Sequence, residues 1–301
     1  MTYHRRRPIW AAWAAAALVS TAVAACSHTS TPPPRPTSAH GPLYMMNRAL
    51  RIGVKIDQPG IGLADTTGTK YTGLDIDFAK EIAAALRDKP VFQPVISRTR
   101  EEMLLSGAVD LVIASYSISE ERLKVIDFAG PYLIAGQDIL IRAGDTSITS
   151  VDSLQSKITC GAAGSNSPTR LAVKFGDTEN VDNDWGKKHL KLLDGYSECM
   201  PLLLDKTVDA ISTDDTILAG FANFPPYRGR VRVVGKRFTS HREKYGVGIV
   251  KGDPADTALI NMAIARMIKD GRWEKIIRKN LGAAAPLFLR PGDRPSPPSG
   301  S

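Results

Sequence analysis

The sequence has little of what most enzymes need. Its five histidines are scattered, at positions 4, 28, 40, 189 and 241, and none has the spacing of metal ligands. Neither the G-x-S-x-G turn of serine hydrolases nor the phosphate-binding G-x-x-x-x-G-K-[ST] loop occurs. We therefore expect a protein that is not an enzyme and that holds no metal and no cofactor.

Positive charge is not concentrated in one place either. The formal net charge is +8, and three of the cations are Arg5, Arg6 and Arg7 near the N-terminus. The rest of the chain has no long basic run and no stripe of alternating basic and aromatic residues. Such a distribution does not favour nucleic acid as a partner.

The N-terminus has the pattern of an export signal. The basic residues Arg5–Arg7 precede an apolar run, Ile9–Ala25, which is too short and too rich in alanine for a good membrane span. The run ends in Val23-Ala24-Ala25-Cys26, which resembles a lipobox. This pattern predicts a lipoprotein signal peptide at residues 1–25 and lipidation of Cys26, which anchors the protein at the extracytoplasmic face of the cell membrane. A plain secretory signal that ends near a cysteine is the alternative.

The chain has only three cysteines, and lipidation of Cys26 leaves the pair Cys160 and Cys199. Outside the cytoplasm such an even pair favours one disulfide. Two buried free thiols are the alternative. The segments that flank the core are rich in proline and serine: residues 26–47 predict a semi-rigid tether, and residues 286–301 predict a disordered tail.

The segment between them alternates between strand-like and helix-like patterns. Leu74, Phe78, Ile82 and Leu86 form an apolar stripe with helical spacing, and Thr99-x-x-Glu102 has the form of a capping box. This alternation predicts a mostly parallel sheet with helices on both faces. Expected strands are Leu50–Ile56, Val91–Ile96, Ile139–Ile141, Ile158–Cys160, Leu190–Leu193, Ala210–Ser212, Val231–Val234 and Gly246–Val250. Further expected helices are one that Ser167 caps with Pro168 as its first residue, 197–205, 215–222, one that starts at Asp253-Pro254, and Arg272–Leu281.

The stretch from Asp110 to Tyr132 has the composition of an anion site. The apolar strand Leu111–Ala114 is followed by alternating serines, and Ser119 is in place to cap a helix whose first turn contains Arg122. A guanidinium can hold a carboxylate with two parallel hydrogen bonds, and the carboxyl end of a strand is a common place for ligands. An arginine on an ordinary surface loop is the alternative.

This stretch resembles the pattern G-x-T-I-T-x-x-R-x-x-x-x-x-F-S-x-P-Y of extracytoplasmic polar amino-acid binding proteins, the solute-binding parts of ABC importers. Serine replaces glycine and threonine, Ala129 replaces the usual serine, and the likeness extends over residues 48 to 282. It implies an α/β fold of the two-lobed, periplasmic-binding-protein-like type II, with hinge crossings near 133–138 and 234–238. Lobe 1 then contains residues 48–135 plus 236–285, and lobe 2 contains residues 136–235.

The same resemblance implies the binding residues. Ser117 and Arg122 match residues that hold the ligand's α-carboxylate, helped by N–H groups around Ser115. The loop Gly164-Ser165-Asn166-Ser167 precedes a helix, so Ser165 and Asn166 are expected to close over that carboxylate. A plain helix cap is the alternative for this loop. Asp214 is expected to accept the α-ammonium.

Specificity is expected to depend on two cations, Lys55 and Arg100, which favour a carboxylate on the ligand's side chain. Both could instead be solvated surface residues. The interpretation is a monomeric lipoprotein that captures glutamate or aspartate, with asparagine and glutamine as alternatives, and delivers it to an ABC permease. An amino-acid sensor that signals to a membrane-bound partner, and an enzyme that reuses this fold, are the rival hypotheses.

Overall fold

The computed structural model describes residues 43, 48–239 and 242–296. The chain divides into two compact units, residues 1–35 and 36–301, and every described residue belongs to the second. The predicted signal peptide, Cys26 and the tether apart from Leu43 lie outside the described residues. No helix in the described part of the chain is long and apolar enough to cross a membrane.

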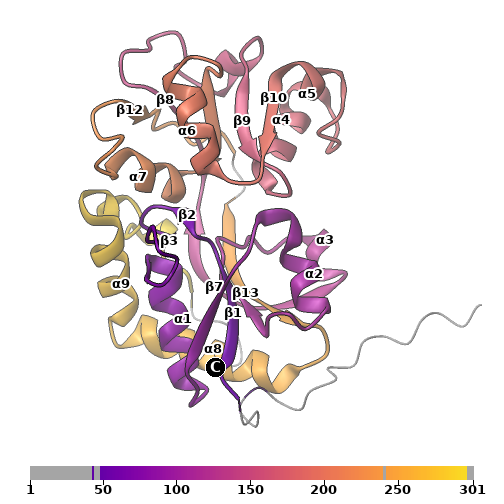
Figure 1. The fold of residues 1–301 in the computed structure, drawn as a ribbon, viewed down its shortest axis with the longest axis vertical. Helices are drawn as coiled ribbons and strands as arrows, with labels where there is room; N and C mark the ends of the chain where they lie inside the picture. The colour runs from indigo at the N-terminus through magenta and orange to yellow at the C-terminus, as the bar shows by residue number, and fades with distance from the viewer. Residues whose placement is uncertain (1–42, 44–47, 240–241, 297–301) are drawn as a thin grey trace, which may run out of the picture. The chain divides into compact units, whose positions relative to one another are not determined.

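The first sheet has five strands in the order β5-β1-β6-β13-β7. All of them run in one direction except β13, which is antiparallel to both neighbours. Helices α1, α8 and α9 pack together beside this sheet, while α2 and α3 lie on its other side (Figure 1). The strands are β1 (Leu50–Val54), β5 (Pro90–Pro94), β6 (Leu111–Val112), β7 (Ile126–Ala135) and β13 (Glu243–Val250), and the helices are α1 (Leu74–Ala85), α2 (Arg100–Leu105), α3 (Glu120–Leu123), α8 (Pro254–Lys269) and α9 (Arg272–Leu281).

The second sheet also has five strands, in the order β10-β9-β11-β8-β12, and here β8 is the reversed strand. Its strands are β8 (Gln137–Arg142), β9 (Thr159–Ala162), β10 (Leu190–Leu193), β11 (Ala210–Asp214) and β12 (Val231–Val233), and its helices are α4 (Asn166–Gly176), α5 (Asp184–His189), α6 (Tyr196–Leu204) and α7 (Asp215–Asn223). A third, small sheet contains β2 (Asp57–Gln58), β3 (Gly62–Ala64) and β4 (Tyr71–Thr72). The predicted two-lobed α/β fold is confirmed, with one reversed strand in each mostly parallel sheet.

The reversed strands follow from the two crossings between the sheets. Only Gly136 separates the end of β7 from the start of β8, and β13 follows β12 after the second crossing. Gln137, the first residue of β8, pairs with Asp214, the last residue of β11. Each reversed strand therefore starts at the carboxyl edge of the sheet that it enters, the edge where ligands bind in open α/β sheets. The exact lobe bounds given above stay a prediction.

Two expected features of the core are confirmed. The stripe on α1 is buried, since Leu74, Phe78 and Ile82 have no exposed surface. Cys160 in β9 and Cys199 in α6 form the expected disulfide, which joins residues 39 positions apart. The bond attaches α6 to the sheet at a point close to the carboxyl end of β9, where the candidate site is found.

One predicted capping bond and one predicted helix start are wrong. Thr99 precedes the first residue of α2, as predicted, but it makes no capping bond, because it also ends a 3-10 turn, Ser97–Thr99, and its hydroxyl donates to the carbonyl of Ile96 at 3.3 Å instead. Helix α4 begins at Asn166 with Ser165 as its N-cap, so Pro168 is the third helical residue rather than the first. The N-cap at Ser119 is confirmed, since its side chain accepts from the Arg122 amide.

The disorder expected for residues 286–301 is wrong for residues 286–296. Two 3-10 turns, Gly282–Leu287 and Pro291–Asp293, carry the chain back over the fold. We call residues 282–296 the C-terminal strap. It is ordered because Phe288 is buried in the core and Asp293, which is 3% exposed, is bonded to Arg237. Residues 297–301 lie outside the described residues.

Candidate functional site

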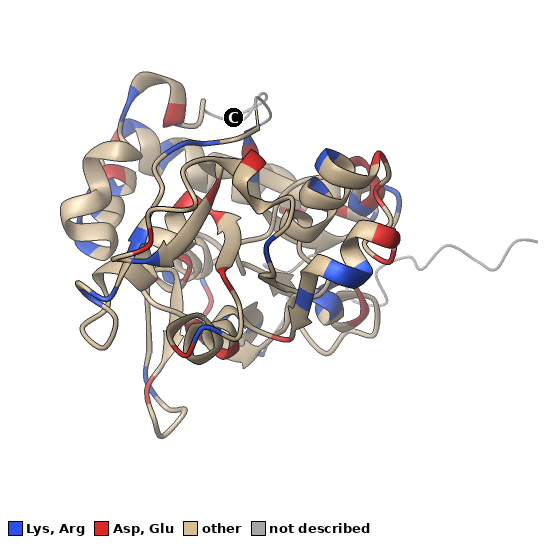
Figure 2. Cartoon of the chain, turned by 90° about the horizontal axis from the view of Figure 1, so that it is seen from above, with Lys and Arg blue, Asp and Glu red and all other residues tan. Residues whose placement is uncertain are grey.

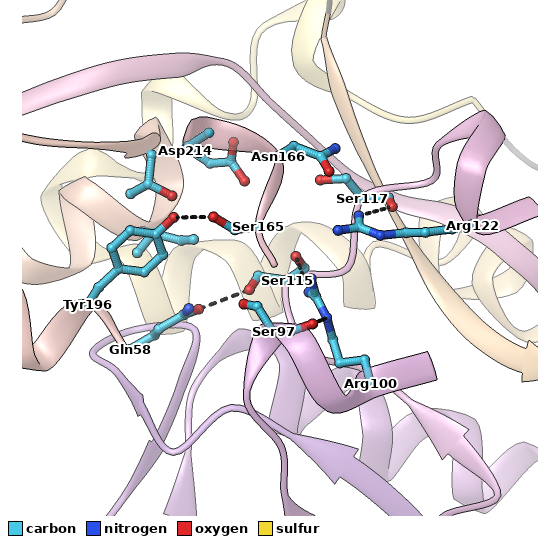
Figure 3. Close-up of a pocket in the computed structure, with 13 residues that line it drawn as sticks. Gln58, Ser97, Arg100, Ser115, Ser117, Arg122, Ser165, Asn166, Tyr196 and Asp214 are labelled. Atoms are coloured by element: carbon cyan, nitrogen blue, oxygen red, sulfur yellow. Dashed lines mark hydrogen bonds between the residues drawn. The ribbon is translucent and has the colours of Figure 1, made fainter. Parts of the chain in front are cut away.

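A polar cavity lies where the carboxyl ends of the two sheets meet (Figure 3). The lining side chains nearly fill it, since they leave only about 10 Å³ for the centre of a water-sized sphere. Seven of the eight ligand-binding residues predicted from the sequence line it; Lys55 does not. The lining comprises Gln58, Ser97, Arg100, Ser115, Ser117 and Arg122 from the first lobe and Ser165, Asn166, Ser167, Tyr196, Thr213, Asp214 and Ile217 from the second.

Arg122 reaches across the cavity from the start of α3. Its Nη1 donates to the carbonyl of Ser117 at 2.6 Å, and its Nη2 donates to the carbonyl of Gly164 in the second lobe at 3.2 Å. Its Nε forms an ion pair with Glu101 at 3.3 Å, and the residue is 8% exposed. The guanidinium is therefore held in one orientation before any ligand arrives.

Arg100 is the second cation of the cavity and is 2% exposed. It donates to the carbonyls of Ser97 and Ala114, at 3.0 and 3.1 Å, and its guanidinium carbon lies 4.2 Å from the ring centre of Tyr116. Burial and the neighbouring Arg122 lower its pKa to about 10. No acidic side chain among the described residues forms an ion pair with Arg100, so its positive charge is left for a negatively charged partner.

Ser115 occupies a tight turn after β6, with a φ of 44°. Its amide donates to Asp75 Oδ2 at 2.7 Å, and its hydroxyl lies 3.0 Å from Gln58 Oε1. Of the N–H groups expected around Ser115, its own amide is therefore already bonded to the buried Asp75 carboxylate. Burial raises the pKa of Asp75 to about 6.

The second lobe contributes the start of α4. Ser165 Oγ donates to the carbonyl of Ala162 at 2.7 Å and lies 3.0 Å from the hydroxyl of Tyr196. Asn166 Nδ2 donates to Glu243 Oε2 at 3.0 Å. Since both side chains are already bonded within the protein, the free amides of the first turn of α4 remain as donors for an anion.

Asp214 ends β11 and is 5% exposed. Its carboxylate accepts from Gln137 Nε2 and from the hydroxyl of Tyr245. Burial, and secondarily the charge of Glu243, raises the pKa of Asp214 well above its usual value. A cationic ligand group beside Asp214 would offset this cost, as the predicted ammonium site requires.

Several site residues were missed from the sequence. Ser97, Tyr196, Thr213 and Gln58 line the cavity. Thr213 could have been found, because it precedes Asp214 at the end of a buried strand. The others lie on elements that reach the cavity only through the tertiary fold.

The chain belongs to the bacterial extracellular solute-binding proteins, family 3, whose model matches residues 50–283. The glutamate-binding protein GluB of Corynebacterium glutamicum is 34% identical over 249 residues, which cover 78% of this chain and 79% of that protein. The glutamine-binding protein GlnH of a Bacillus subtilis ABC transporter is 34% identical over 237 residues, which cover 77% of this chain and 81% of that protein. A solved structure of an ancestral arginine-binding protein bound to glutamine matches with a TM-score of 0.69 and 34% identity, over 79% of this chain and 99% of that one.

Proposed function

We propose that this protein is a lipid-anchored receptor that captures glutamate or aspartate between its two lobes and delivers it to an ABC permease. The observation that carries the proposal is the pairing of two buried arginines with one buried aspartate across a small cavity. The similarity to a glutamate-binding and a glutamine-binding protein supports the same ligand class. We propose that the site binds the solute without catalysing a reaction, so that the solute is released unchanged.

An α-amino acid fits the charges of the cavity in one orientation. Its α-carboxylate lies between Arg122, Ser117 and the amides at the start of α4, and its α-ammonium lies beside Asp214. The side chain then extends towards Arg100. This orientation places each ligand charge beside a protein group of opposite charge, which a buried ion requires.

Closure of the lobes is supported by contacts around the cavity. Arg98 and Asp194 form an ion pair at 2.8 Å, and Asp57 accepts from the Ser197 amide at 3.3 Å. Both contacts join the first lobe to the second. A ligand that touches both lobes stabilises this arrangement by the contacts it cannot make when they separate. We propose that the permease recognises the closed form.

Calorimetric titration of residues 27–301 with glutamate, aspartate, asparagine, glutamine and arginine tests the ligand. We expect glutamate or aspartate to bind at micromolar concentration or below. The Asp214→Asn variant should bind at least about 100-fold more weakly, because the ammonium loses its charged partner, while Asp205→Asn, at an exposed position, should bind as the wild type does. Failure of all five amino acids to bind would contradict the proposal.

Delivery and anchoring need a second experiment in cells. Uptake of labelled glutamate should fall when the gene is deleted and recover with the wild-type gene. A Cys26→Ala variant should lose lipid labelling and be released from the membrane. Unchanged uptake together with an altered transcriptional response to glutamate would instead support the sensor hypothesis.

A further inference from the structure

Lys55 is a buried cation that does not line the cavity. It follows β1 directly and is 2% exposed, and its Nζ lies 2.8 Å from Ser97 Oγ. Ser97 does line the cavity, beside Arg100, whose Nε donates to the Ser97 carbonyl. Lys55 therefore reaches the site through one hydroxyl group rather than by direct contact (Figure 3 shows Ser97 at the cavity wall).

The direction of the bond between these two residues follows from their chemistry. A lysine ammonium has three donors and no acceptor, so it must donate to Ser97 Oγ. The hydroxyl hydrogen of Ser97 is then left for another acceptor, and no described residue offers one within hydrogen-bond distance. The open direction is the cavity, so Ser97 presents a donor to whatever lies beside Arg100.

The groups around Lys55 favour its neutral form more than its charged form. Burial and the nearby Arg100 lower its pKa to about 7, with a smaller contribution from Arg122, while Asp57 and Asp75 act in the opposite direction. Neither aspartate forms an ion pair with Lys55, and no other described carboxylate does. Of the polar groups packed against it, only Ser97 bonds the ammonium.

We propose that Lys55 and Ser97 form a relay that selects ligands with a carboxylate at the end of the side chain. This inference rests on the proposed function and names the residues that separate an acidic ligand from its amide. With Lys55 protonated, Ser97 donates to the side-chain carboxylate while Arg100 supplies the adjacent charge. A neutral Lys55 amine can accept the Ser97 hydrogen, and the donor to the ligand is then lost.

The relay couples ligand binding to protonation. A carboxylate placed beside Ser97 favours the charged form of Lys55, so above pH 7 glutamate binding draws one proton from solvent onto Nζ. Glutamine carries no such charge and draws fewer protons. Protons exchanged by the α-ammonium, by Asp75 or by Asp214 are common to both ligands, so the difference between glutamate and glutamine isolates the side-chain subsite.

Calorimetry at pH 8 in buffers of different ionisation enthalpy measures this difference. We expect glutamate to take up about one proton more than glutamine, as follows for a group that is mostly neutral at this pH. Lys55→Met should abolish the difference and reduce the preference for glutamate by about 10-fold or more. Ser97→Ala should reduce that preference, because it should weaken glutamate binding more than glutamine binding. Lys70→Met, at an exposed lysine, is the matched control.

Three results would overturn the relay. One is equal proton uptake for both ligands in the wild type, which needs no variant and so holds even if Lys55→Met fails to fold. Another is a Ser97→Ala variant that weakens glutamate and glutamine equally, since Ser97 then faces the α-carboxylate. The third is binding of no amino acid at all, which removes the proposed function together with the relay; the first two leave the receptor intact.

Discussion

Arg237 and Asp293 join the second crossing between the lobes to the C-terminal strap. Arg237 Nη1 donates to both carboxylate oxygens of Asp293, at 2.9 and 3.2 Å, and its Nε bonds Asp215. Asp215 in turn accepts from the amide of Gly136 at the first crossing, at 3.1 Å. The family model ends at residue 283, so the strap extends beyond the part of the chain that the model matches. One arginine thus connects both crossings to a segment outside that match.

Asp293→Asn should lower the free energy of unfolding by about 2 kcal/mol, because the buried Asp293 carboxylate forms ion pairs with both Arg237 and Arg242. Urea denaturation measures this change. The matched control is Asp270→Asn, which removes a surface ion pair with Arg272 and should change the stability far less, because solvent screens exposed charges. Equal stability of the two variants would show that the ion pairs of Asp293 do not hold the strap.

Reduction of the Cys160–Cys199 disulfide should destabilise the protein by about 3–4 kcal/mol, as expected for a closed loop of this length. Thermal unfolding with and without reductant measures the shift, and mass spectrometry after thiol alkylation counts free thiols. Since α6 also carries Tyr196 at the cavity, glutamate affinity should fall as well. Two alkylated cysteines before reduction would contradict the disulfide.

The ion pairs of Asp110 predict a pH dependence of stability. Burial opposes ionisation, but hydrogen bonds from Arg48 and Arg51 outweigh it and lower the pKa of Asp110 to about 2. Because this value lies below the unfolded value of about 3.9, the stabilisation is complete above about pH 4 and is lost as the pH falls towards 2. Asp110→Asn should cost about 1–2 kcal/mol at pH 7, since the arginines are partly exposed, and progressively less below pH 4. A cost that is constant from pH 7 to pH 3 would contradict this account.

Close approach of the two lobes at Gly164 gives another prediction. Its φ is +76°, and a Cβ there would lie 2.6 Å from the Cα of Arg98 in the other lobe. Gly164→Ala should therefore weaken glutamate binding by about 10-fold or more, because the closed form is obstructed. Gly229 has the same φ and nothing within 4 Å of its Cβ position, so Gly229→Ala carries the backbone strain without the clash. Equal glutamate affinities of the two variants would contradict the proposed closure of the lobes.

Local patterns in the sequence predicted the parts of the fold and site that depend on short stretches. The stripe on α1, the cap at Ser119 and the position of Asp214 at a strand end all follow from neighbouring residues. Cationic and anionic residues are interspersed along the ribbon (Figure 2), as they are along the sequence. These features needed no knowledge of which strands pair.

The errors arose where distant segments meet. Lys55 does not line the cavity; its ammonium bonds Ser97, which lies 42 residues later in the sequence. The Ser115 amide donates to Asp75, which lies 40 residues earlier. The strap looked disordered because its composition is polar and rich in proline, yet Asp293 meets Arg237 across 56 residues. Composition cannot show such a partner, because the contact exists only after both segments are placed by the fold.

We propose that the cavity holds an amino acid through Arg122. The most direct measurement is the dissociation constant of glutamate for the wild type, Arg122→Ala and the control Arg228→Ala, an exposed arginine, by calorimetry at pH 7. We predict micromolar or tighter binding to the wild type and to the control, and a loss of at least about 100-fold in Arg122→Ala, because a buried charge-assisted pair is removed. Binding to Arg122→Ala with wild-type affinity would contradict the account.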